Sequence, residues 1–251
     1  MTSVNPLRAR RRPMVIGHRG AAAVAPENTI PSFQAAWATG VGWVEADVQP
    51  TADDVFVLIH DDDLDRTTDG AGPLRDHAAR DVAALDAGSW FAPQFAGAGV
   101  PELSQLLERL TGDCRLLLEV KGAFTARQIE GLIAAIRGVG AQDRLLLESF
   151  ELDALQMIRQ VLPDEPLGLL VEHLDPDPVE ACRALGATAY NPNFAELLSR
   201  PEVIGPLHDA DIAIMVWTAN KPADWDRLTN LGVDAIITDD PGALLAWQIG
   251  E

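Results

Sequence analysis

Short apolar segments alternate with segments of helical periodicity along almost the whole chain. Eight apolar segments are rich in Val, Ile or Leu and have the length of buried strands, and each is followed by a stretch with helical spacing. Such repeats indicate βα units and a parallel sheet covered by helices. The predicted strands span Met14–Gly17, Gly42–Asp47, Arg115–Lys121, Arg144–Ser149, Leu167–Val171, Ala187–Tyr190, Ile212–Trp217 and Asp234–Thr238. The predicted helices span Thr29–Thr39, Leu103–Leu110, Ala126–Gly138, Leu152–Leu162, Pro178–Leu185, Ala195–Ala210, Ala223–Leu231 and Pro241–Gln248.

Eight strand–helix units in 251 residues leave a choice between a closed barrel and an open, doubly wound sheet. The chain has neither the G-x-G-x-x-G turn of dinucleotide-binding sheets nor the G-x-x-x-x-G-K loop that cradles nucleotide phosphates. The sequence therefore predicts an α/β fold, a (β/α)8 TIM barrel, in which residues 1–251 form a single domain.

One segment interrupts the repeat after the second strand. Val55–His60 is a further strand candidate, and a turn of small and acidic residues is expected to fold it back antiparallel to Asp47–Pro50. The following segment, Asp62–Gly99, is rich in Gly, Ala and Asp and has little periodicity. We therefore predict a small insertion after the second strand, covering about residues 62–100.

Acidic residues outnumber basic ones, with 38 Asp and Glu against 19 Lys and Arg, which gives a formal net charge of −19. This excess excludes a general electrostatic attraction to nucleic acid or to an anionic membrane. An anionic substrate would need a metal ion or a few basic side chains at one mouth, because salt screens fields beyond about 10 Å. We therefore expect a small-molecule substrate, no nucleic-acid partner and no insertion into a membrane.

The two cysteines and the basic N-terminal run carry no chemistry in this interpretation. Cys114 and Cys182 lie far apart and form no C-x-x-C pair, which favours buried reduced thiols. The basic run Arg8–Arg12 resembles the start of a signal segment, but Pro13 and a short strand follow it in place of a longer apolar region. We expect a solvated tail at these residues and a cytoplasmic location.

Polar residues gather where the predicted strands end. In a barrel the active site lies at the carboxyl ends of the strands, so these residues are expected to converge on one mouth. His60 reaches the same mouth from the returning arm of the hairpin. The set is His18 and Arg19 after the first strand, Glu45 and Asp47 on the second, His60 on the arm, and Glu119 and Lys121 on the third.

The spacing of the acids predicts a metal site. Glu45 and Asp47 are two apart on a strand, so both side chains face the same side, and Glu119 ends the next barrel strand. Three crowded carboxylates repel one another unless a proton or a cation is shared, and all-oxygen ligation suits a hard divalent ion, Mg²⁺ or Ca²⁺. A buried ion-pair network with Arg19 and Lys121 is the structural alternative.

The two histidines fit a different task. A displacement at phosphorus needs one group that takes a proton and one that gives it, and imidazoles exchange protons near neutral pH. His18 and His60 are candidates for this pair. Arg19 and Lys121 would hold the non-bridging phosphate oxygens, Arg as a fork and Lys as a point charge.

These motifs, in this order, resemble the glycerophosphodiester phosphodiesterase family. The resemblance continues to the end of the chain and covers nearly all of it. Its first blocks are Gly17-His18-Arg19-Gly20, Pro26-Glu27-Asn28-Thr29, Val44-Glu45-Ala46-Asp47-Val48 and His60-Asp61. Its later blocks are Leu64-Asp65-Arg66-Thr67-Thr68, Leu118-Glu119-Val120-Lys121, Ser149-Phe150, Trp217-Thr218-Ala219-Asn220 and Gly232 to Asp239.

The resemblance implies a TIM-barrel hydrolase that cuts glycerophosphodiesters to glycerol 3-phosphate and an alcohol with one divalent cation, Mg²⁺ or Ca²⁺, with Mn²⁺ as a further candidate. It implies that Trp217 and Phe150 wall the pocket. An enzyme of the phospholipase D type, acting on lysophospholipids, is the alternative and predicts a more apolar mouth. A barrel that only binds a phosphorylated ligand, without hydrolysing it, is the non-enzymatic alternative. The remaining implied roles are His18 and His60 as acid and base, Glu45, Asp47 and Glu119 as metal ligands, and Arg19 and Lys121 as phosphate contacts.

Overall fold

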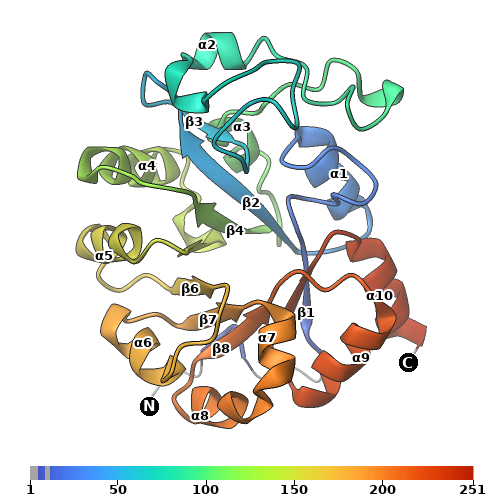
Figure 1. Ribbon diagram of the computed structural model, residues 1–251, viewed down its shortest axis with the longest axis vertical. Coiled ribbons are helices and arrows are strands. Elements are labelled where there is room, and N and C mark those ends of the chain that lie inside the picture. Colours follow the sequence, from blue (N-terminus) through green and yellow to red (C-terminus); the bar gives the residue numbers. More distant parts are fainter. Residues whose placement is uncertain (1–4, 9–11, 251) are drawn as a thin grey trace.

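The computed structural model describes residues 5–8 and 12–250 of the chain. It shows a ring of strands with helices around the outside (Figure 1). The strands are β1 (Met14–Gly17), β2 (Trp43–Pro50), β3 (Phe56–Leu58), β4 (Arg115–Val120), β5 (Leu145–Ser149), β6 (Leu167–Val171), β7 (Ala189–Pro192), β8 (Ala213–Val216) and β9 (Ala235–Thr238).

The sheet closes on itself. The strand order is β1-β9-β8-β7-β6-β5-β4-β2-β3, and a further pairing joins β1 to β2. All of these pairings are parallel except that of β3, which runs antiparallel to β2 and pairs Val48 with Leu58. Eight parallel strands therefore form the barrel, and β3 is the returning arm of a hairpin on its rim. The predicted TIM barrel with an insertion after its second strand is confirmed.

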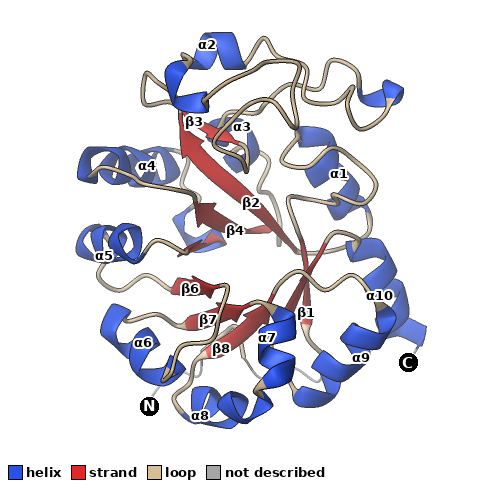
Figure 2. Cartoon of the chain, viewed as in Figure 1, coloured by secondary structure: helices blue, strands red, loops and turns tan. Residues whose placement is uncertain are grey.

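Helices lie between successive barrel strands (Figure 2). Asp177 begins α6 by accepting a hydrogen bond from the backbone N–H of Glu180, and Asp240 accepts one from Ala243 at the start of α10. The helices are α1 (Ile30–Ala38), α2 (Ala79–Val82), α3 (Leu103–Leu107), α4 (Ala126–Gly138), α5 (Leu152–Val161), α6 (Pro178–Leu185), α7 (Phe194–Ser199), α8 (Ile204–Asp209), α9 (Pro222–Leu231) and α10 (Pro241–Gly250).

The predicted helix Ala195–Ala210 is wrong as a single element. The chain forms α7 and α8 there, separated by a 3₁₀ turn at Pro201–Val203. Pro201 has no N–H to donate and pushes the residue before it out of the helical region, so Arg200 takes φ −137° and ψ 58°. The break follows directly from the proline.

Side chains alternate between two cores along each barrel strand. Those that face outward pack against the helices, and those that face inward fill the lower part of the barrel. On β4, Leu117 belongs to the interior cluster and Glu119, two residues further, reaches the upper end. The strand period therefore places an apolar plug below and polar side chains above it. The buried interior cluster consists of Leu7, Met14, Ile16, Leu117, Leu146, Ala189, Ala213, Met215, Ala235 and Ile237.

The N-terminal segment closes the amino-terminal end of the barrel. Asn5 donates side-chain hydrogen bonds to the carbonyls of Thr188 and Asp211, and Leu7 packs into the interior cluster. The prediction of a solvated tail is wrong for Arg8, which lies 3.8 Å from Asp211, while residues 9–11 lie outside the described part of the chain. Among the described helices, none combines the length and apolar character that crossing a membrane requires.

The insertion after β3 has a small core of its own (top of Figure 1). Leu64, Leu74 and Val82 pack there against Val57 and Ile59 from the hairpin arm. Much of the rest is loop. Hydrogen bonds from backbone N–H groups to side chains hold this loop in place. The insertion therefore sits on the arm that carries His60.

Asp86 is expected to stabilise this insertion. Its carboxylate accepts hydrogen bonds from the backbone N–H groups of Gly88, Ser89 and Gly97, at 2.7 to 2.8 Å. These bonds hold the pKa of Asp86 well below its usual range. A carboxyl whose pKa is lowered by folding stabilises the fold above its unfolded pKa of about 3.9, and the stabilisation declines as the pH falls below it.

We therefore expect Asp86→Asn to lower the melting temperature at neutral pH. The difference from the wild type should shrink as the pH falls below about 4. Calorimetry across this range measures it, with Asp81→Asn as the control because Asp81 lies in the same insertion, its side chain is exposed and its ion-pair partner Arg80 is exposed too. A difference that stays constant with pH would contradict the role of the Asp86 charge.

Candidate active site

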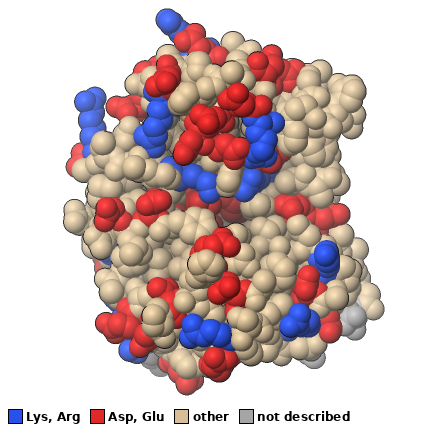
Figure 3. Space-filling model, viewed as in Figure 1, with Lys and Arg blue, Asp and Glu red and all other residues tan. Residues whose placement is uncertain are grey.

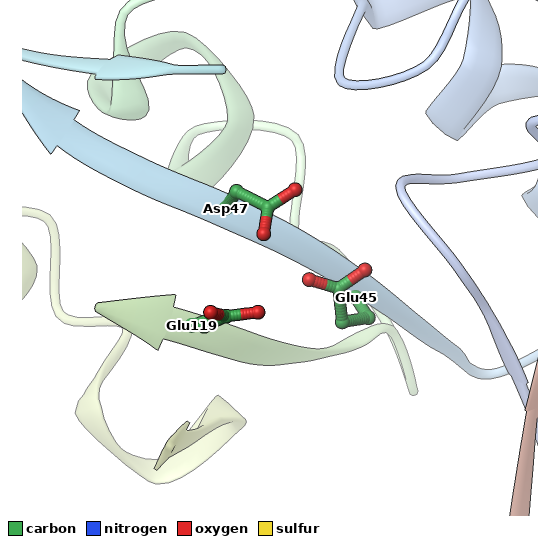
Figure 4. Close-up of side chains that lie close together, drawn as sticks. All are labelled: Glu45, Asp47 and Glu119. Atoms are coloured by element: carbon green, nitrogen blue, oxygen red, sulfur yellow. The ribbon is translucent and has the colours of Figure 1, made fainter. Parts of the chain in front are cut away.

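Three buried carboxylates converge at the carboxyl end of the barrel (Figure 4). Glu45 and Asp47 project from β2 and Glu119 from β4, and the strand register sets Asp47 directly beside Glu119. One oxygen of each carboxylate lies within 4.8 Å of an oxygen of the other two. These three are the predicted metal ligands, and the structure brings them together.

Two cations partly neutralise this cluster. Arg19 Nε lies 3.2 Å from Asp47 Oδ2, and Lys121 Nζ donates to Glu119 Oε1 at 2.7 Å and lies 3.6 Å from Asp47 Oδ1. Glu45 Oε1 and Asp47 Oδ1 are buried and have no hydrogen-bond partner within the described part of the chain. The ion-pair network that the sequence left open therefore exists, but it leaves two buried carboxylate oxygens without a donor.

The protonation of the three acids reflects this imbalance. Burial alone would raise the pKa of Asp47, but Arg19 and Lys121 outweigh it and hold that pKa well below its ordinary value. Burial and the charge of Asp47 raise the pKa of Glu45 and of Glu119 well above the ordinary value. The cluster thus holds more acid groups than its own cations can keep ionised.

His18 is held by a carboxylate that follows the neighbouring strand, β9. Its Nδ1 lies 2.6 Å from Asp239 Oδ1, and Asn220 donates to the other oxygen of Asp239 at 2.5 Å. An ionised carboxylate only accepts, so Nδ1 carries a proton and Nε2 is the free nitrogen. That Nε2 lies 4.0 Å from Glu45 Oε2, on the side of the acid cluster.

His60 has the same kind of support from a different source. Its Nδ1 lies 2.6 Å from Oδ1 of the adjacent Asp61, and Nε2 has no hydrogen-bond partner among the described residues. Burial lowers the pKa of His60, so the ring tends to be neutral at pH 7. Both predicted histidines therefore present Nε2 as their unpaired nitrogen.

A tight turn after β1 places Arg19 over the acids. Gly17 cannot carry a side chain there, because a Cβ would lie 2.2 Å from the carbonyl oxygen of Gly20. Arg19 takes the left-handed conformation, with φ +50°, and its backbone N–H donates to Glu45 at 2.8 Å. Asn28, also left-handed, donates to Asp47 Oδ2 at 2.8 Å and accepts from the Asp47 backbone.

A buried acid–amide pair next to the cluster is missing from the sequence interpretation. Glu148 on β5 lies beside Glu119 in the register and accepts a hydrogen bond from the side chain of Asn191 on β7. Burial raises the pKa of Glu148 to about 8, although the Asn191 bond opposes the shift. Gly168 lies between the two residues and provides space for this hydrogen bond, since a Cβ at Gly168 would lie 2.7 Å from Asn191 Nδ2. Glu148 lies next to the carboxyl end of its strand, so a complete search for polar residues at strand ends would have identified it.

The aromatic residues predicted to wall the pocket are in contact. Phe150 and Trp217 meet edge to face with ring centroids 5.5 Å apart, and Lys121 Nζ lies 5.6 Å from the Phe150 ring centroid. Together with both histidines they line a small cavity of about 50 Å³ above the acids.

A wider cavity of about 620 Å³ opens beside the small one and shares four residues with it. Its wall combines acidic and basic side chains, and Figure 3 shows acidic side chains flanked by basic ones on this face. The two cavities together provide room for a reacting group and a larger substituent. The four shared residues are His60, Glu119, Lys121 and Phe150.

Comparison with known proteins decides which family this arrangement belongs to. The family model described as the glycerophosphoryl diester phosphodiesterase family matches residues 18–243, a span that contains all the predicted site residues. The chain belongs to this family. The resemblance drawn from the motifs and the enzyme class of phosphoric diester hydrolases are therefore confirmed.

Relatives match the chain over most of its length. A glycerophosphodiester phosphodiesterase of Caldanaerobacter subterraneus is 34% identical, over 92% of this chain and 96% of that protein. The structure of an Oleispira antarctica phosphodiesterase in complex with the product sn-glycerol-3-phosphate is 28% identical, with a TM-score of 0.90, over 95% of this chain and 97% of that one. A glycerophosphodiester phosphodiesterase structure from Agrobacterium tumefaciens is 31% identical, with a TM-score of 0.82, over 93% and 99%.

The buried Glu148 gives this family member a pH-dependent stability. Its pKa rises from about 4.3 in an unfolded chain to about 8 in the fold, so folding retains a proton that the unfolded chain loses. The wild type should therefore lose stability relative to Glu148→Gln as the pH rises from about 4.5 to about 8, with no further loss above that.

Melting temperatures of both proteins in a chelating buffer, between about pH 5 and pH 9, measure this difference. Glu151→Gln is the matched control, because Glu151 is exposed and three residues further along the chain. An advantage of the Gln variant that does not grow between about pH 5 and pH 8 would show that Glu148 is ionised in the fold.

Proposed function

We propose that the protein hydrolyses glycerophosphodiesters to glycerol 3-phosphate and an alcohol with a divalent cation and a pair of histidines. The observation that carries this proposal is that the cluster of three acids and the two imidazoles meet at one cavity, which two of the acids and both imidazoles line. Glu45 and Glu119 line the cavity of about 50 Å³ together with His18 and His60. Metal ligands and proton carriers can therefore act on the same phosphorus atom.

The donor set fits a hard divalent ion. Glu45, Asp47 and Glu119 offer only oxygen, and the two orphaned oxygens, Glu45 Oε1 and Asp47 Oδ1, have the unsatisfied charge that a cation would neutralise. Mg²⁺, Ca²⁺ and Mn²⁺ all suit such ligands. When bound, the ion would act as a Lewis acid on a phosphoryl oxygen and lower the pKa of the attacking hydroxyl group.

The side chains of the chain itself would divide the remaining work. Lys121 has three donors and uses one on Glu119, so the others can hold a phosphate oxygen. Arg19, held at 2.6 Å by Glu27, would contact a second oxygen. One histidine would take the proton from the nucleophile at its free Nε2 and the other would give a proton to the leaving alcohol. The nucleophile is water or the neighbouring glycerol hydroxyl, which would give a cyclic phosphate first.

The wider cavity would take the alcohol. Its wall contains Asp61, Asp62, Asp63, Asp65 and Arg66, so its mouth is charged and wet. A lysophospholipid substrate, the alternative raised by the sequence, would need an apolar mouth for its acyl chain. The cavity therefore favours a water-soluble glycerophosphodiester.

The direct test supplies metal-stripped protein with Mg²⁺, Ca²⁺ or Mn²⁺ and with glycerophosphocholine or lysophosphatidylcholine. We expect release of glycerol 3-phosphate from glycerophosphocholine only when an ion is present. Enzymatic detection of glycerol 3-phosphate measures it. Turnover of lysophosphatidylcholine alone, or undiminished turnover with chelator, would overturn the proposal.

His18→Ala and His60→Ala are each expected to lower kcat by about 10²- to 10⁴-fold, the usual contribution of general acid–base catalysis. Because neither ring is among the proposed ligands, Mn²⁺ affinity should change little. Turnover and Mn²⁺ titration by electron paramagnetic resonance measure the two effects, and His173→Ala is the control because the His173 side chain is 81% exposed and lines neither cavity. Wild-type turnover in either variant would remove that histidine from the pair.

Glu45→Gln is expected to weaken Mn²⁺ binding by more than the roughly 10- to 100-fold that loss of an outer-shell partner costs. The amide keeps the size of the side chain and an acceptor for the Arg19 N–H but loses the charge. The same Mn²⁺ titration measures it, with Glu130→Gln on the exposed face of α4 as the control. Unchanged affinity would exclude Glu45 as a ligand.

A further inference from the structure

Arg66, in the insertion, forms four hydrogen bonds that join two separate loops. Its Nε and Nη2 donate to the two oxygens of Asp61, at 2.6 and 3.0 Å. Its Nη1 and Nη2 donate to the two oxygens of Glu27, both at 2.8 Å. One guanidinium therefore clamps the residue after His60 to the loop between β1 and α1.

Both ends of this clamp touch the proposed machinery. The Asp61 oxygen that accepts from Arg66 Nη2 also lies 2.6 Å from His60 Nδ1. The Glu27 oxygen that accepts from the same Nη2 also accepts from Arg19 at 2.6 Å. A continuous chain of charge-assisted hydrogen bonds thus runs from His60 through Arg66 to Arg19.

Only arginine can make this clamp. The planar guanidinium presents two edges, and each edge here meets both oxygens of one carboxylate. A lysine ammonium is a single point charge. It could donate good hydrogen bonds to one of the two carboxylates but could not pair with both oxygens of each. The hydrogen bonds from Arg66 also lower the pKa of Asp61 to about 2, so Asp61 remains an acceptor at every working pH.

We propose that Arg66 is a positioning residue for the hydrolysis proposed above: it holds Asp61 against His60 Nδ1, and Glu27 anchors it there. Asp61 is only part-buried, with 30% of its side chain exposed, so without Arg66 it can turn to solvent. An imidazole without an acceptor at Nδ1 populates both tautomers. In the fraction protonated at Nε2, His60 could not act as the base that takes a proton from the nucleophile, and as the acid it would lack the carboxylate that favours its protonated ring.

The test measures kcat, KM and the His60 tautomer in Arg66→Met. We expect kcat to fall by about 10- to 100-fold, as for other partners that orient a histidine, with KM changed by less than about threefold. Nitrogen-15 spectra of the imidazoles, with His60 assigned from His60→Ala, should change from one tautomer to a mixture. A merely structural arginine would lower the melting temperature without changing the tautomer.

Two further variants test whether the geometry of the Arg66 hydrogen bonds matters or only its positive charge. Arg66→Lys keeps the charge but not the fork, so its kcat should fall nearly as far as that of Arg66→Met. Asp61→Asn combined with Arg66→Met should lose little more than the worse single variant, because both act through one chain. Arg80→Met is the control, since Arg80 belongs to the same insertion, is 86% exposed and lines neither cavity.

An unchanged tautomer in Arg66→Met, an unchanged kcat, or full activity in Arg66→Lys would each overturn the positioning role. If Arg66→Met does not fold, Arg66→Lys carries the same measurements. A wild-type protein that hydrolyses no glycerophosphodiester would instead overturn the proposed function. The tautomer measurement decides the role of Arg66 independently of that result.

Discussion

Repulsion between buried carboxylates is the constraint on which this site depends. Asp47 and Glu119 are neighbours in the strand register, and Glu148 follows on the next strand. Unit charges a few ångströms apart repel far more strongly when buried than in water. The surroundings differ at each position: Arg19 and Lys121 lower the pKa of Asp47, whereas burial raises the pKa of Glu148. The two acids left unbalanced, Glu45 and Glu119, lie with Asp47 in the cluster that could hold a cation.

The barrel tolerates such a cluster because the apolar residues that stabilise the fold and the acids of the site lie in different layers of its interior. Along β4, Leu117 belongs to the apolar interior and Glu119 to the mouth, and the same parallel hydrogen bonds hold both. The lower layer supplies the burial that stabilises the fold. The upper layer can then carry charges that would destabilise a smaller domain, and the strand period fixes the side of the sheet to which they point.

The sequence predicts the parts of this site that depend on short spacing. Glu45 and Asp47 share a face because they are two apart, and a closed barrel brings His18 and Glu119 to the same end. Contacts between distant segments were not predictable in this way. Arg66 meets Glu27 across 39 positions. The break in Ala195–Ala210 is a different case. Pro201 indicated a break in the sequence, but the apolar spacing on both sides of it favoured one continuous helix.

The two histidines differ in how their orientation is secured. His18 follows β1, and its partner Asp239 follows β9, so the parallel pairing of Gly17 with Thr238 fixes both. His60 lies on the arm beyond the barrel wall, where no barrel strand provides an acceptor. The acceptor there is the adjacent Asp61, and Arg66 of the insertion, whose side chain is 45% exposed, donates to both oxygens of Asp61. The insertion is therefore connected, through Arg66, both to the partner of His60 and to the loop that carries Arg19.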